Sequence, residues 1–375
     1  MIRVLIVDDS AFNRVTIERL LEGAPDIQVV GTAVDGYDAI RKIRRLQPDL
    51  LTLDLEMPNM DGLSLLRWVM TQQPLPVLVV TSRESNCSLF EALELGALDF
   101  ILKPGRVSPE LPVIRRALLA KIREIVGSRP LMRRPMGTRP SGSVPRSDTV
   151  AGTPVGCRLF ALAASTGGPP ALQTILRGLS PEFPGAVVIA QHMPAYFTTA
   201  FARRLNDLCA LPVREADHGD AVGCGQVLVA PGGRQMTIRG EAATGRLWVD
   251  LHDPGTSDRH VPSGDVLMES AARSCGAASA GIVLTGMGDD GSRGLAAIRK
   301  AGGRSMAESE TTAVVYGMPR HAVATGAVER VCALEEIAGA MEFMARMPLS
   351  TPIGPDSSAG PITTTVETTT WREQQ

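Results

Sequence analysis

The sequence lacks any run of about 18 consecutive apolar residues, so it predicts no membrane-spanning helix. It also lacks an excess of one charge. Its 38 Lys and Arg against 40 Asp and Glu give a net charge of −2, which argues against a nucleic-acid binder that works through bulk charge. The N-terminal segment MIRVLIVDDS places acids directly after its first apolar run, so it is not expected to be a signal peptide.

No CxxC pair occurs among the six cysteines, which are scattered along the chain. This absence argues against a zinc site or a disulfide framework, and it favours reduced thiols in a cytoplasmic protein. The six are Cys87, Cys157, Cys209, Cys224, Cys275 and Cys332.

The chain has 375 residues, of which 44% are apolar and 21% charged. This composition is ordinary for a folded protein, and at about 150 residues per domain the length predicts two or three domains. Residues 127–154 are rich in Pro, Gly, Ser and Arg and are predicted to be a flexible linker, whereas the Thr-rich residues 348–375 are predicted to be a disordered tail. Two globular pieces are left, 1–126 and 155–347.

Both pieces show α/β patterns. The first predicts a doubly wound, flavodoxin-like parallel sheet of five strands, at residues 3–7, 27–31, 50–53, 77–80 and 100–102, with helical patterns between them. The second predicts a larger, Rossmann-like and mostly parallel sheet. Its expected buried strands are residues 159–163, 187–191, 226–230 and 282–285, with a hairpin formed by 236–239 and 246–251.

Reactive side chains stand where the strands of the first piece end, which is where ligands bind in open α/β sheets. Asp8 and Asp9 follow the first strand, Asp54 the third, Thr81 the fourth and Lys103 the fifth. Three carboxylates that converge favour a divalent cation, and oxygen ligands suit Mg²⁺. Asp54 is then placed to attack phosphorus and become an aspartyl phosphate. Simple capping of strand ends is the alternative for each residue taken alone.

The segments VLIVDDS, LLTLDLEMPNMDG, VVTS and DFILKP resemble the receiver domain of two-component response regulators over residues 1–120. The resemblance implies that Asp54 accepts a phosphoryl group from a histidine kinase of a chemosensory system. It implies a cis bond between Lys103 and Pro104. It assigns Asp8, Asp9, Asp54 and the backbone carbonyl of Glu56 to Mg²⁺, and Thr81, Phe100 and Lys103 to the switch that reports phosphorylation.

In the second piece, Ser165 follows one expected strand and precedes a helix, His192 ends another, and the loop GMGDDG ends a third. A serine, a histidine and an aspartate from separate strands can form a nucleophile, a base and an orienting acid. By spacing alone, STGGP could also be a helix cap or a phosphate loop, and GMGDDG a metal loop or a turn. Neither a GxSxG elbow around Ser165 nor a P-loop lysine is present, which disfavours an ordinary α/β-hydrolase and a P-loop nucleotide enzyme.

The segments AASTGGP, QHMP, APGG, RHVPSGDVL, LTGMGDDG and YGMPR resemble the catalytic domain of chemotaxis protein-glutamate methylesterases, the CheB family. With the receiver, the resemblance covers residues 1–346. It implies hydrolysis of glutamate methyl esters on methyl-accepting chemoreceptors with release of methanol and, in many members, deamidation of receptor glutamines. The implied protein is a cytoplasmic monomer that neither binds nucleic acid nor enters the membrane.

The family motifs assign roles to individual residues. Ser165 is the nucleophile and His192 the general base, while Asp290 rather than Asp289 is the orienting acid, because the family loop has the form TGMG-x-DG. Met287 offers a backbone N–H to the oxyanion, and Thr166 lies beside the nucleophile. Ester hydrolysis itself is expected to need no cofactor. The alternative is a response regulator with a non-catalytic binding output domain, although residues 155–347 show no basic recognition-helix pattern.

Overall fold

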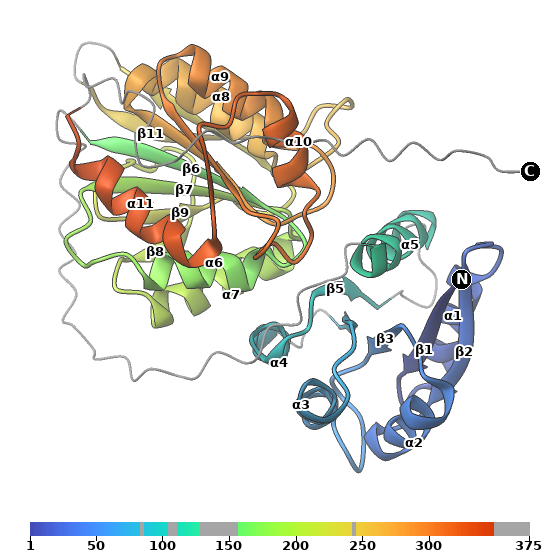
Figure 1. The fold of residues 1–375 in the computed structure, drawn as a ribbon. Coiled ribbons are helices and arrows are strands. Elements are labelled where there is room, and N and C mark those ends of the chain that lie inside the picture. The colour runs from blue at the N-terminus through green and yellow to red at the C-terminus, as the bar shows by residue number, and fades with distance from the viewer. Residues whose placement is uncertain (83–85, 104–110, 128–156, 242–244, 349–375) are drawn as a thin grey trace, which may run out of the picture.

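The computed structural model describes residues 1–82, 86–103, 111–127, 157–241 and 245–348 (Figure 1). Almost all of the expected linker and tail, and the bond between Lys103 and Pro104, lie outside the described residues. A cis peptide bond is recorded between Val261 and Pro262, which the sequence did not predict. Among the described residues, no helix has the length and apolar character to cross a membrane.

The first unit is a parallel five-stranded sheet with the strand order β2-β1-β3-β4-β5. This is the flavodoxin-like order, so the predicted fold class is confirmed. Its elements are β1 (Ile2–Val7), α1 (Ala11–Leu21), β2 (Ile27–Ala33), α2 (Gly36–Leu46), β3 (Leu50–Leu53), α3 (Gly62–Gln72), β4 (Val77–Thr81), α4 (Asn86–Leu95), β5 (Asp99–Leu102) and α5 (Leu111–Gly127).

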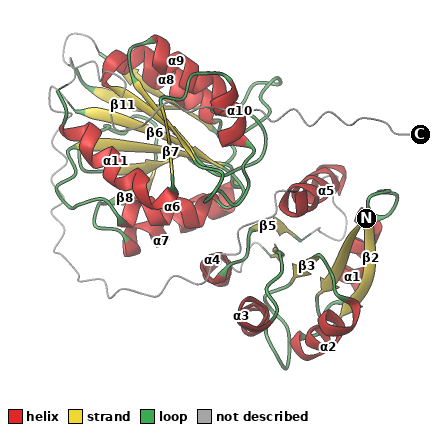
Figure 2. Ribbon diagram, viewed as in Figure 1, coloured by secondary structure: helices red, strands yellow, loops and turns green. Residues whose placement is uncertain are grey.

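Helices cover both faces of this sheet (Figure 2). One core cluster joins the strands to α2, α3 and α4, and the other joins them to α1 and α5. Strands β3 and β4 are buried throughout because both of their faces are covered, which explains their continuous apolar runs. Short polar side chains start the helices: Asp61, for example, accepts the backbone N–H of Ser64 at 2.7 Å and caps α3.

The second unit contains a parallel seven-stranded sheet with the order β14-β13-β12-β6-β7-β9-β8, and a separate antiparallel hairpin of β10 and β11. Its elements are β6 (Arg158–Ala164), α6 (Gly168–Arg177), β7 (Gly185–Gln191), α7 (Ala195–Leu208), β8 (Val213–Glu215), β9 (Val227–Val229), β10 (Gln235–Gly240), β11 (Leu247–His252), α8 (Gly264–Cys275), a 3-10 turn η1 (Gly276–Ala278), β12 (Ser279–Val283), α9 (Ser292–Lys300), β13 (Arg304–Glu308), α10 (Met318–Ala324), β14 (Arg330–Cys332) and α11 (Leu334–Arg346).

The mostly parallel sheet and the hairpin were both predicted, and both are present. Helices α6, α7 and α11 pack on one face of the sheet, and α8, α9 and α10 pack on the other (Figure 2). The sequence did not predict the short strands β8, β13 and β14. The expected strand 282–285 is in fact β12, which ends at Val283, so Thr285 belongs to the loop that follows.

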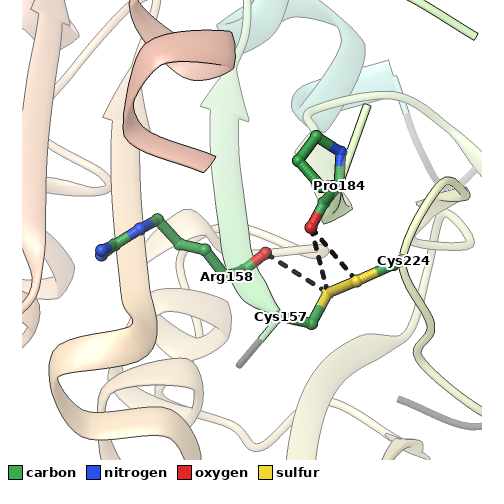
Figure 3. The surroundings of a disulfide bond; sticks show 4 residues. All are labelled: Cys157, Arg158, Pro184 and Cys224. Atoms are coloured by element: carbon green, nitrogen blue, oxygen red, sulfur yellow. Dashed lines mark hydrogen bonds between the residues drawn. A yellow bond between two sulfur atoms is a disulfide. The ribbon is translucent and has the colours of Figure 1, made fainter. Parts of the chain in front are cut away.

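The expectation of reduced thiols is wrong for one pair, because Cys157 and Cys224 form a disulfide (Figure 3). No sequence motif predicted this bond, since the two cysteines lie 67 residues apart and meet only because β6 and β9 flank β7 in the sheet. Among the described residues the free cysteines are Cys209, Cys275 and Cys332.

Candidate active site and phosphorylation site

Ser165 and His192 follow two adjacent parallel strands. The last pair in register between β6 and β7 is Ala164 with Gln191, so the next residue on each strand is one of the two. The N–H of His192 donates to the carbonyl of Ala164 at 3.0 Å, which continues the ladder by one step. Neighbouring strands lie about 4.8 Å apart, so the hydroxyl and the imidazole start from adjacent positions at the carboxyl edge of the sheet.

The imidazole of His192 is held by Asp290, whose Oδ2 lies 2.7 Å from Nε2. The same carboxylate accepts hydrogen bonds from Ser263 Oγ at 2.8 Å and from the backbone N–H groups of Gly264 at 2.6 Å and Asp265 at 3.0 Å. These donors form the N-terminus of α8, where helix N–H groups favour a negative charge. Burial opposes ionisation, but the bond from His192 and these N–H donors outweigh it and lower the pKa of Asp290.

This arrangement separates two acids that sequence reasoning from the residues alone could not separate. Asp289 is exposed, whereas Asp290 is 3% exposed and holds the histidine. Because Asp290 occupies Nε2, the nitrogen left for the Ser165 hydroxyl is Nδ1. No hydrogen bond from Ser165 Oγ to His192 is present in the part of the chain that the structure describes; such bonds are often long before substrate binds.

A second histidine, His260, lies flat against His192, with ring centroids 4.5 Å apart and ring planes 5° from parallel. Sequence reasoning left its role open between lining the site and a structural one. Burial, and then the neighbouring His192, lower the pKa of His260 and so favour its neutral form. A polar cavity of about 320 Å³ lies beside the pair, and its walls include His260, Asp289 and Arg293.

Backbone N–H groups are available next to Ser165. The N–H groups of Thr166 and Met287 donate to no acceptor within the described residues. The family resemblance placed Met287 at the oxyanion and Thr166 beside the predicted nucleophile. Gly286 brings its loop close to Ser165, because a Cβ at that glycine would lie only 2.6 Å from Ser165 Cβ. Unpaired backbone N–H groups beside a serine are the kind of donor that an oxyanion hole uses.

At the carboxyl edge of the first sheet, Asp8, Asp9 and Asp54 each offer a carboxylate oxygen within 4.8 Å of the others. Lys103 Nζ lies 2.6 Å from Asp54 Oδ2 and 3.3 Å from Asp8 Oδ2. Burial, and then the charge of Asp8, raise the pKa of Asp54 to about 6, although Lys103 opposes the shift. An oxygen-only donor set with surplus negative charge fits Mg²⁺.

Of the remaining predicted receiver residues, Glu56 lies at this cluster. The N–H of Glu56 donates to Asp54 Oδ1 at 3.2 Å, so Glu56 lies at the site, and its carbonyl as a metal ligand stays a prediction. Thr81 is buried at the end of β4, and its hydroxyl donates to the Ser82 carbonyl at 3.3 Å. The Phe100 ring contacts Phe197 of the second unit.

Comparison with known proteins assigns both units. Residues 4–111 match the response regulator receiver domain, and residues 160–341 match CheB methylesterase. A protein-glutamate methylesterase/protein-glutamine glutaminase 3 of Geobacter sulfurreducens is 47% identical over 355 residues, covering 90% of this chain and 95% of the relative. The chain belongs to the CheB methylesterase family. It is therefore a carboxylic ester hydrolase with an N-terminal receiver domain.

A second relative of this methylesterase agrees. Protein-glutamate methylesterase/protein-glutamine glutaminase 1 of Myxococcus xanthus is 44% identical over 347 residues, which cover 92% of this chain and 98% of the relative. The crystal structure of the Thermotoga maritima CheB methylesterase catalytic domain is 31% identical, with a TM-score of 0.49, and covers 50% of this chain and 98% of its own.

The receiver domain contacts the methylesterase domain directly beside Ser165. Thr166 Oγ1 donates to Asp99 Oδ2 at 2.5 Å, and the N–H of Gly167 donates to the Leu98 carbonyl at 3.1 Å. Asp99 is the first residue of β5, and Leu98 directly precedes it. The receiver therefore holds the two residues that follow Ser165.

Aromatic rings extend this contact along α7. Phe100 meets Phe197 edge to face at 4.8 Å, and Phe90 of α4 stacks on Phe201 at 5.6 Å. Further along α7, Arg204 donates two hydrogen bonds, of 2.9 and 2.8 Å, to the Glu94 carboxylate. Helix α7 begins three residues after His192, so the receiver touches the segments that follow both the serine and the histidine.

Proposed function

We propose that this chain is a phosphorylation-regulated serine esterase that hydrolyses glutamate methyl esters on chemoreceptors and releases methanol. The observation that carries the proposal is the buried Asp290 on Nε2 of His192, with Ser165 at the adjacent strand end. The substrate class is supported by the printed names of relatives that match about 90% of the chain.

In the proposed reaction, His192 Nδ1 accepts the proton of the Ser165 hydroxyl as the oxygen attacks the ester carbonyl. Asp290 stabilises the imidazolium that forms, and the N–H groups of Thr166 and Met287 bind the oxyanion. The imidazolium then protonates the leaving methanol. Water attacks the glutamyl ester of Ser165, again with His192 as the base, and the free glutamate leaves.

The same residues can act on a glutamine side chain, where ammonia leaves in place of methanol. The acyl-enzyme and its hydrolysis are then unchanged. The names of the relatives include protein-glutamine glutaminase, which supports this second substrate.

Regulation is proposed to act through the receiver. Asp54 takes a phosphoryl group from a histidine kinase of the chemosensory system, and Lys103 holds the phosphoryl oxygens. Mg²⁺, held by Asp8, Asp9, Asp54 and the carbonyl of Glu56, would neutralise the charge of that group. The change at Asp54 reaches Thr81 and Phe100, weakens the contact of Phe100 with Phe197, and exposes the serine to the receptor.

The test is methanol release from receptor membranes that carry radiolabelled methyl esters. Ser165→Ala should lower the rate on the order of a thousandfold or more, and Thr174→Ala, on the next helix, should leave it within about threefold. A small phosphodonor should raise the rate of the full chain roughly 5–150-fold, but not that of Asp54→Asn. Methanol release that survives in Ser165→Ala would refute the proposed esterase.

A fragment of residues 155–375 tests the receiver's part alone. If the unphosphorylated receiver occludes Ser165, the fragment is faster than the unphosphorylated full chain and does not respond to the phosphodonor. Equal rates for the fragment and the unphosphorylated chain would contradict occlusion while leaving the esterase proposal intact.

A further inference from the structure

The disulfide lies where the chain enters the methylesterase domain (Figure 3). Cys157 directly precedes β6, and Cys224 lies in the turn before β9. Their Cα atoms are 6.2 Å apart, within the normal range for a disulfide, so both backbones sit where a bond can form without moving. Both residues are half-buried, so solvent can reach this pair.

The same site also accommodates two thiols. The carbonyl oxygen of Pro184 lies 3.2 Å from Cys224 Sγ and 3.7 Å from Cys157 Sγ (Figure 3). In the disulfide neither sulfur carries a proton, but after reduction each S–H finds this carbonyl within reach as an acceptor. Pro184 therefore offers each thiol an acceptor close to the place that its sulfur occupies in the disulfide.

The free cysteines of the described chain are in different surroundings. Cys209 and Cys332 are buried, at 7% and 1% exposure, and burial raises the pKa of Cys275 to about 12. Only the thiolate attacks a disulfide, so these three are expected to stay reduced.

We propose that Cys157 and Cys224 form a reversible redox pair. When it is oxidised, the disulfide links the start of β6 to the turn before β9 and stabilises the methylesterase domain. The oxidant is a low-molecular-weight disulfide. One protein thiolate attacks it, forms a mixed disulfide and releases one small thiol. The second protein thiolate then attacks the protein sulfur of that bond and releases the other small thiol. Two electrons pass to the oxidant, and the two cysteine protons end on the released thiols.

The bond should change stability and not catalysis. It closes a loop of 67 residues that contains both Ser165 and His192, so it removes much freedom from the unfolded chain. Yet it lies at the opposite end of β6 from Ser165, a strand of seven residues that spans roughly 23 Å. That end is already anchored by the buried Arg158, which donates to the carbonyls of Met344 at 3.1 Å and Ala277 at 3.0 Å.

The experiment uses the full chain, equilibrated with oxidised glutathione or with dithiothreitol. The oxidised protein should lose two hydrogen atoms by intact mass, yield a peptide linked through Cys157 and Cys224, and melt roughly 5–10 °C higher than the reduced protein. The rate of methanol release at 25 °C should be the same for both within about twofold.

Cys157→Ser and Cys224→Ser should each remove the difference in melting temperature, because the serine hydroxyl keeps the Pro184 carbonyl as an acceptor but cannot form the bond. Cys275→Ser is the matched control and should keep the difference. The proposal is overturned if both cysteines stay open to alkylation after oxidation, or if the linked protein melts with the reduced one. If oxidation changes the esterase rate and not the melting temperature, the claim that the bond affects stability but not catalysis is refuted.

Discussion

At the scale of single residues, Asp289 and Asp290 offer a matched pair for testing how His192 is oriented. Asp290→Asn keeps the size of the side chain but replaces the acceptor that fixes the Nε2–H tautomer. We expect kcat for methanol release to fall on the order of 10⁴-fold, with a much smaller change in KM, because the lost carboxylate stabilises the imidazolium formed during the reaction.

Asp289→Asn is the control. It removes one negative charge from the same loop, but at an exposed side chain. It should stay within about threefold of the parent rate. Because Asp290 also accepts bonds from the start of α8, thermal melting of both variants should be recorded. A drop for Asp289→Asn equal to that for Asp290→Asn would contradict the assigned roles.

The ionisation of Asp54 is expected to depend on pH and on Mg²⁺. Its pKa is raised to about 6 by burial and by Asp8, so without metal the carboxyl should be protonated below that pH and ionised above it. A divalent cation favours the ionised form, so adding Mg²⁺ should move the midpoint to lower pH. Carboxyl ¹³C NMR of the metal-free and Mg²⁺-loaded protein measures both midpoints, with Asp54→Asn to assign the signal. A midpoint that Mg²⁺ leaves unmoved would argue against a metal site here.

At the scale of elements, α4 and α7 carry the contact between the domains. Phe90→Ala removes the ring that stacks on Phe201. We expect the unphosphorylated protein to release methanol roughly tenfold faster, since losing an aromatic contact weakens docking by about 1–3 kcal/mol. The phosphodonor should then add little more.

Phe12→Ala is the matched control, because Phe12 is also on a receiver helix, α1, and is 45% exposed. It should leave both the basal and the activated rates unchanged. If Phe90→Ala behaves like Phe12→Ala while the receiver still folds, the α4–α7 contact does not restrain the enzyme.

Elements with strong patterns could be predicted from sequence. Strands β1, β3, β4 and β5 of the receiver are mostly apolar runs followed by reactive residues, and the edge at which those residues gather follows from that pattern. Strand β13, with the sequence RSMAE, has no such run because it includes Arg304 and Glu308, and only its place beside β12 makes it a strand. The stacking of His260 and the bond from Thr166 to Asp99 depend on residues far apart in sequence, so no local spacing could reveal them.

At the scale of the whole molecule, Glu124 of α5 is half-buried where the receiver meets α10. Its Oε1 lies 2.9 Å from where a Cβ on Gly317 would stand, and its Oε2 is buried with no hydrogen-bond partner among the described residues. Burial raises the pKa of Glu124 from 4.5 to about 7. The charged groups that act on it are Lys121 and Asp99 from the receiver, and Arg320 and His321 from α10.

Undocking would return Glu124 to water and its pKa toward 4.5, so the docked state binds the proton more tightly. Docking is therefore strongest below pH 4.5, and it weakens as the pH rises through the docked pKa of about 7. We expect the rate of fragment 155–375 divided by that of the unphosphorylated full chain to fall several-fold between pH 6 and pH 8. The division cancels any pH dependence of the active site that both proteins share. Glu124→Gln, which stays neutral at every pH, should flatten the ratio. Glu22→Gln, at an exposed residue that ends α1, should not. A ratio that keeps its slope in Glu124→Gln would contradict this role of Glu124.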